Sequence, residues 1–147
     1  MIMTLLGMSG AGKSHWAKRL EQHGFTRISI DDLVETRLSA RLIEQGYKGG
    51  LRDLSAWMGQ PYDKQYKQHS QAYLNAERDA ICQVLATIHD YPSDGHHVVI
   101  DTTGSLVYMP SSVLRKLAKR TIMVYLNTPE FAHKHMIQPY LQDPKPV

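Results

Sequence analysis

The sequence predicts an α/β fold in three layers, α/β/α, around a mainly parallel sheet of four to five strands. A short apolar run at residues 2–6 is typical of a strand buried on both faces of a parallel sheet. Similar short runs alternate along the chain with longer segments of helical periodicity, the pattern of parallel strands joined by helices. The length of 147 residues suits one domain, which we place at 1–147.

The elements of the first third follow from local patterns. A helix over 14–23 is expected to end at Gly24, a usual helix stop. Residues 25–30 return to β-forming types and predict the second strand. Asp32 is expected to cap the second helix, over 33–43.

The remaining elements are interrupted by glycine and proline, above all within residues 44–71. In order, we expect a short helix (51–58), a long helix (62–88), a loop (91–95), a strand (97–100), a helix (from 111 or 112 to 119), a strand (121–126) and a last helix (129–140). The chain stops soon after that helix, so it is either a minimal fold or shorter than its relatives at the C-terminus.

Composition narrows the class of protein. The only cysteine, Cys82, excludes an intramolecular disulfide, and its apolar surroundings at 80–85 predict a buried core residue. A single free thiol suits a reducing cytoplasm, where we expect the protein to act. No run of roughly 18 apolar residues predicts a membrane span.

The charge pattern is a mild positive excess, which suits an anionic substrate. The formal net charge is only +3, and no run of five or more Lys and Arg residues occurs, so a nucleic-acid partner is not favoured. The densest basic stretch, 115–120, is typical of a solvated helix face. The histidines at 96–97 and at 133 and 135 lack further ligands at a zinc-like spacing, which favours structural or surface roles. We expect a monomer or a homodimer.

The most specific motif lies between the first strand and the first helix. Residues 7–14 match G-x-x-x-x-G-K-S, the phosphate-binding loop of the P-loop NTPase fold, in its required strand–loop–helix setting. Its glycines let backbone N–H groups wrap a phosphate, and the following helix adds its N-terminus. Lys13 is expected to reach the β- and γ-phosphates of ATP, and Ser14 to ligate Mg²⁺. The predicted ATP-binding residues are Gly7, Ser9, Gly10, Ala11, Gly12, Lys13, Ser14 and His15.

Two later strands end in aspartate. Asp31 follows the second strand and Asp101 the third, and the carboxyl ends of parallel strands form the ligand-binding edge of such sheets. We expect Asp101 to hold Mg²⁺, with a turn or cap residue as the alternative. Asp31 is expected to orient or deprotonate an acceptor hydroxyl, which makes Lys13 and Asp31 the predicted catalytic pair.

These residues carry a family resemblance. The glycine loop, Asp31 with Glu35, and the run Asp101-Thr102-Thr103-Gly104 together resemble the shikimate kinase family, in the nucleoside monophosphate kinase-like branch of P-loop kinases. The resemblance implies a kinase fold, ATP with Mg²⁺, an acceptor hydroxyl at Asp31, and a substrate turn at Thr103 and Gly104.

The sequence also departs from that family. Ser29 stands where the family has a companion aspartate, and residues 73–77 lack the arginine that grips the substrate carboxylate. The segment 130–140, where the family has a lid bearing arginine, contains Lys134 but no arginine. The phosphate half of the site is therefore kept, while the acceptor half is altered.

The leading hypothesis is an ATP-dependent kinase for a hydroxyl of a small metabolite. Arg52 is the local candidate to grip an anionic acceptor, with a solvated surface arginine as the alternative. The aromatic segment 57–62 lines a pocket or packs in the core. The alternatives are a nucleotide-binding module without turnover, acting as a sensor or by binding a partner, and a kinase for a nucleoside or polynucleotide end.

Overall fold

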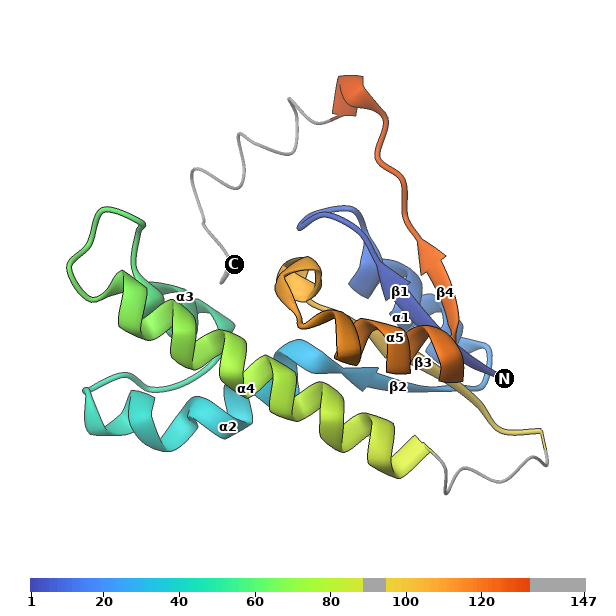
Figure 1. The fold of residues 1–147 in the computed structure, drawn as a ribbon, viewed down its shortest axis with the longest axis horizontal. Helices are drawn as coiled ribbons and strands as arrows, with labels where there is room; N and C mark the ends of the chain where they lie inside the picture. Colours follow the sequence, from blue (N-terminus) through green and yellow to red (C-terminus); the bar gives the residue numbers. More distant parts are fainter. Residues whose placement is uncertain (89–94, 133–147) are drawn as a thin grey trace.

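The computed structural model describes residues 1–88 and 95–132, and it confirms the predicted α/β fold (Figure 1). Its sheet has four parallel strands in the order β2-β3-β1-β4. The strands are β1 (Ile2–Leu6), β2 (Phe25–Ser29), β3 (His97–Asp101) and β4 (Ile122–Tyr125). Their register places Ser29 beside Asp101, and Asp101 beside Leu5, at the carboxyl edge of the sheet.

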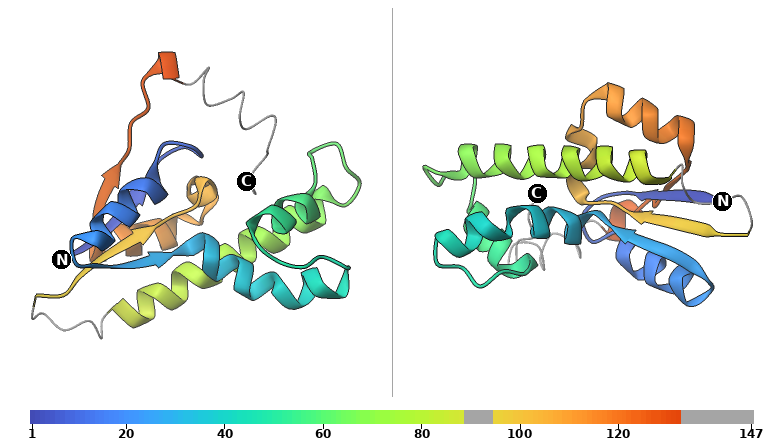
Figure 2. Two further views of the ribbon diagram at one scale, coloured as in Figure 1. Left: turned by 180° about the vertical axis from the view of Figure 1, so that it is seen from behind. Right: turned by 90° about the horizontal axis from the view of Figure 1, so that it is seen from below.

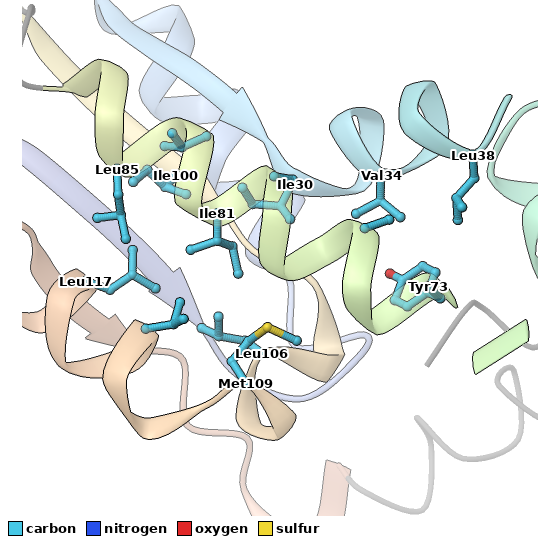
Figure 3. Packing of buried hydrophobic residues seen from close by; sticks show 14 of the residues in the cluster. Ile30, Val34, Leu38, Tyr73, Ile81, Leu85, Ile100, Leu106, Met109 and Leu117 are labelled. Carbon is cyan, nitrogen blue, oxygen red and sulfur yellow. The ribbon is translucent and has the colours of Figure 1, made fainter. Parts of the chain in front are cut away.

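Helices cover both faces of this sheet, as the right-hand view of Figure 2 shows. On one face, α1 (Lys13–Gln22) contributes Ala17 to a small core with Leu5 and Val99. On the other lie α4 (Tyr66–Thr87) and α5 (Ser111–Arg120). The larger core beneath them includes Ile81, Leu85, Ile100, Leu106 and Leu117 (Figure 3). The predicted three layers are therefore confirmed.

Two further helices extend this core beyond the sheet. They are α2 (Ile30–Glu44) and α3 (Leu51–Met58), which pack against each other and against α4. Figure 3 shows Tyr73 of α4 facing Val34 and Leu38 of α2. In α3, Trp57 is buried and its indole Nε1 donates to Gln45 Oε1 at 2.8 Å. For this residue, the core interpretation of the segment 57–62 is the correct one.

The predicted cap at Asp32 is wrong, because α2 begins earlier than expected. Ser29 is the N-cap residue, and its hydroxyl accepts from the backbone N–H of Asp32 at 3.2 Å. Asp31 and Asp32 therefore lie inside the first helical turn, where negative charge complements the helix dipole. Serine at the end of the strand offers the better cap geometry, since its short side chain reaches the third residue of the helix.

The prediction that Cys82 is buried is also wrong, because Cys82 is exposed on α4. The core stripe of this helix includes Ile81 and Leu85, and the residue after Ile81 is turned about 100° away from it. The long helix also starts later than predicted, at Tyr66. Asp63 ends the preceding turn by accepting from the backbone N–H of Gln60 at 2.7 Å.

Other boundaries differ less from the predictions. A 3₁₀ helix, η2 (Gly104–Tyr108), follows β3 and was not expected from the sequence. Most of the predicted helix over 129–140 lies outside the described residues. Over the described part of the chain, no helix is long and apolar enough to cross a membrane.

Candidate nucleotide-binding site

The glycine loop has the backbone conformation that its motif requires. Gly10 has φ 82° and Gly12 has φ 88°, in the left-handed region that side chains rarely adopt. Gly12 is also the N-cap of α1, so the loop leads directly into the free N–H groups of that helix. At Gly7, a Cβ atom would lie 2.9 Å from the backbone oxygen of Leu126. Glycine is therefore required at position 7 because a side chain would collide with Leu126, and at position 12 because the backbone is left-handed.

Lys13 is held over the loop that precedes it. Although it carries a charge, its side chain is buried, and its Nζ donates to the backbone oxygens of Gly7 at 2.8 Å and Met8 at 2.9 Å. These bonds offset part of the cost of burying an ammonium group. They also fix the ammonium beside the backbone N–H groups that form the predicted phosphate site.

Ser14 and Asp101 meet as the sequence predicts. Asp101, the last residue of β3, is buried, and its Oδ1 accepts from the Ser14 hydroxyl at 3.3 Å. A hydroxyl and a carboxylate side by side are oxygen ligands of the kind that Mg²⁺ prefers. The residues present therefore fit the predicted metal ion.

Arg27 is a site residue that the sequence analysis missed. From β2, its Nη2 and Nε donate to Oδ2 of Asp101 at 2.8 and 3.2 Å. The sequence does contain one indication of this role. Arg27 stands two positions before Ser29 in a strand, and alternate residues of a strand point to the same face. Only the register, which pairs Ser29 with Asp101, shows what the charge faces.

A second buried carboxylate organises the residues after β3. Glu77 of α4 is fully buried and accepts from the hydroxyls of Thr103 and Ser105, the latter at 2.6 Å. Burial raises the pKa of Glu77 above its ordinary value, the two hydroxyls oppose this rise, and the charge of Asp31 adds to it. The Thr103 hydroxyl is thus turned inward, and its predicted contact with substrate stays a prediction.

Tyr73 lies one helical turn before Glu77, close to Asp31. Its hydroxyl is buried and makes no hydrogen bond of good geometry with any described residue. Burial raises the pKa of Tyr73, and the nearby carboxylates of Asp31 and Glu77 raise it further. The phenol of Tyr73 therefore keeps its proton and remains a hydrogen-bond donor beside Asp31, the residue predicted to bind the acceptor hydroxyl.

The turn after β3 touches the phosphate loop. A Cβ atom at Gly104 would lie 3.2 Å from Cβ of Ser9 and 3.3 Å from its backbone nitrogen, so only glycine fits without displacing the loop. The carboxylate of Glu77 holds the residues on either side of Gly104. The structure thus brings the predicted substrate turn against the predicted ATP-binding loop.

Two predicted residues are not part of this cluster. Arg52 is exposed in the first turn of α3, and it has no hydrogen bond or ion pair within residues 1–88 and 95–132. His15 is exposed and meets the edge of the Trp16 ring, at 5.7 Å between ring centroids. Lys134 and the histidines at 133 and 135 lie outside the described residues.

A family model matches nearly the whole chain. Residues 2–139 match the model of a family described as an AAA domain. The chain belongs to this family. The match and the fold together confirm the resemblance to shikimate kinase-like P-loop kinases.

A solved structure gives the same fold. The chain is similar to the shikimate kinase from Acinetobacter baumannii in complex with shikimate, with a TM-score of 0.57 and 20% identity. The similarity covers 96% of this chain and 66% of that one, so the chain spans just under two thirds of that kinase. At this identity the likeness concerns the fold alone. No curated protein matches the sequence.

Proposed function

We propose that this protein is an ATP- and Mg²⁺-dependent phosphotransferase that moves the γ-phosphate of ATP to a hydroxyl of a small molecule. The observation that carries the proposal is the convergence of Lys13, the Ser14–Asp101 pair and the turn at Gly104 on one edge of the sheet. In parallel α/β sheets this edge is where ligands bind.

Each residue has a role that its chemistry supports. The loop N–H groups and Lys13 hold the phosphates. On binding, phosphate oxygens replace the backbone oxygens of Gly7 and Met8 as the hydrogen-bond partners of Lys13. Ser14 and Oδ1 of Asp101 would hold Mg²⁺, because Oδ2 is already bound by Arg27. When bound, the metal ion would neutralise negative charge on the transferring phosphoryl group.

Transfer needs one proton acceptor. The acceptor oxygen forms a bond to the γ-phosphorus while the bond from that phosphorus to the β–γ bridging oxygen breaks, and ADP leaves. The proton of the acceptor hydroxyl goes to the carboxylate of Asp31, which stands in the first turn of α2. Tyr73 and Glu77 lie beside this carboxylate. Positioning supplies most of the catalysis in such reactions.

The test is the Lys13→Ala variant, with Lys18→Ala as a control because Lys18 is exposed on the same helix. We expect ATP affinity, measured by calorimetry, to fall about 100-fold in the first variant and to stay unchanged in the second, since a charge-assisted bond is lost. Transfer of labelled γ-phosphate is measured over a panel of hydroxylated metabolites and nucleosides. Unchanged ATP affinity in Lys13→Ala would show that the loop is not the phosphate site.

A second candidate is a nucleotide-binding module without turnover. It is supported by the sequence after residue 128, which contains no arginine to stabilise charge in the transition state. Tight ATP binding by the unmodified protein, with no labelled product over the whole panel, would favour this module over the kinase.

A further inference from the structure

A groove on the outer side of the α2–α4 pair collects positive charge from distant parts of the sequence. Its volume is about 990 Å³, and it is lined by Arg37 and Arg41 of α2, by Lys64 just before α4 and by Lys67 in the first turn of α4. Figure 1 shows these two helices side by side, away from the phosphate loop. The cations stand in two pairs some 25 residues apart, so no basic run is visible in the sequence.

The groove carries an excess of positive charge. Among the described residues, Asp79 is the only acidic one in its lining, so the four cations leave that lining with a net charge of +3. Asp79 is already paired with Arg78, at 3.1 Å between Nη2 and Oδ1. Over the described residues, Arg41, Lys64 and Lys67 have no ion-pair partner.

This arrangement costs stability unless an anion is bound. Arg37 and Arg41 are four residues apart on one helix face, where like charges repel. Arg37 donates to Gln83, which has no charge, and so leaves the repulsion in place. A bound polyanion would remove the repulsion from all four cations together.

We propose that this groove binds the phosphate backbone of a nucleic-acid strand. Arginine and lysine, with the amides of Gln68 and Asn75 in the same lining, are the donors that phosphate oxygens accept from. Within residues 1–88 and 95–132, no aromatic side chain lines the groove, so bases have no surface to stack on, and binding depends on the backbone rather than on base sequence.

The lining argues against the other anionic partners. An acidic peptide usually needs a large apolar anchor in a pocket, and in the part of the chain that the structure describes the apolar lining residues are only Leu38, Ala72 and Ala76. A membrane surface is too broad to enter a groove between two helices. A nucleic-acid strand is narrow, and its regularly repeated charge can follow the groove.

The proposal is tested by fluorescence anisotropy with labelled single-stranded DNA and RNA of mixed sequence, about 20 nucleotides long, without ATP. The Arg41→Gln/Lys67→Gln variant removes two groove charges. Lys116→Gln/Lys119→Gln removes two charges from exposed positions of α5 and is the matched control. Between about 50 and 200 mM salt, we expect the slope of log K against log salt to become less steep by about 1.4 in the groove variant only.

The expected result also includes an affinity loss of about tenfold in the groove variant. Three results would overturn the proposal: no binding by the unmodified protein at low salt, equal losses in both variants, or tighter binding of a polyglutamate peptide than of DNA or RNA. Lys13→Ala should still bind DNA and RNA, because Lys13 is not part of the groove. The kinase function has its own test, so either proposal can fail without the other.

Discussion

Arg27 and Asp101 form a charge-assisted pair across neighbouring strands, with Nη2 2.8 Å from Oδ2, at the point where the candidate metal site begins. Asp101 is 1% exposed and the Arg27 side chain 17%, so the carboxylate is removed from water while its partner remains at the surface. The pair fixes one oxygen of Asp101 and leaves the other facing Ser14. The orientation of the proposed metal ligand therefore depends on a residue of a different strand.

The first prediction concerns this pair. Arg27→Gln should lower the free energy of unfolding by about 2–3 kcal/mol, because it leaves a buried carboxylate without its cation. Urea unfolding measures the loss. Arg78→Gln is the control, since it breaks a pair with Asp79 whose side chains are 44% and 54% exposed, and such surface pairs contribute about 1 kcal/mol or less. Equal losses in the two variants would show that burial does not strengthen the Arg27–Asp101 pair.

The second prediction separates backbone strain from ligand binding. Gly12 and Gly46 have nearly the same φ, 88° and 87°, and a Cβ atom would make no close contact at either. Gly12→Ala and Gly46→Ala should each lower stability by about 1 kcal/mol through the left-handed backbone. Only Gly12→Ala should also weaken ATP binding, because Gly12 is the N-cap of the helix whose free N–H groups form part of the proposed phosphate site. Calorimetry with ATP on both variants checks this, and a loss of affinity in Gly46→Ala would contradict it.

How much the sequence predicts depends on the range of the interactions involved. The glycine loop follows from a local pattern, because a strand–loop–helix motif carries its own geometry. The Ser14–Asp101 contact is long-range, and it was predictable because the carboxyl ends of parallel strands meet at one edge of the sheet. Arg27 could not be assigned, because its partner depends on the pairing of β2 with β3, two strands about 70 residues apart in the chain.

Side-chain competition explains other differences. Ser29 takes the cap position expected for Asp32, because both residues could cap and only the chain direction out of β2 selects one. Glu77 belongs to the segment 73–77, which stands out in the sequence only for the arginine that it lacks, whereas its partners, Thr103 and Ser105, come from the turn after β3. Buried networks of this kind are set by tertiary packing, which no local pattern encodes.

A third prediction tests the orientation of α4. Cys82 is exposed, so a maleimide should modify it stoichiometrically in the folded protein. Modification should leave the melting temperature and ATP affinity unchanged, because the thiol points away from the core stripe that contains Ile81 and Leu85. Mass spectrometry follows the reaction. Modification that occurs only in urea would show that residue 82 is buried and that the helix is rotated.

The fourth prediction concerns pH and the buried carboxylate of Glu77. Burial raises its pKa in the folded protein above the ordinary value, so the folded state holds the proton to higher pH than the unfolded state does. The stability that this proton contributes is complete below the ordinary pKa and is lost as pH rises through the raised pKa. The difference in unfolding free energy between the unmodified protein and Glu77→Gln should therefore shrink as pH rises above the ordinary carboxyl pKa of 4.5.

Urea unfolding of both proteins at each pH measures this difference, in which the other titrating groups cancel. Glu44→Gln, at the exposed end of α2, is the control for removing a carboxylate from the surface. A difference that grows with pH would mean that the hydroxyls of Thr103 and Ser105 stabilise the ionised carboxylate by more than burial costs. In that case Glu77 would act as a fixed anion beside Asp31, and its charge would shape which acceptors can approach.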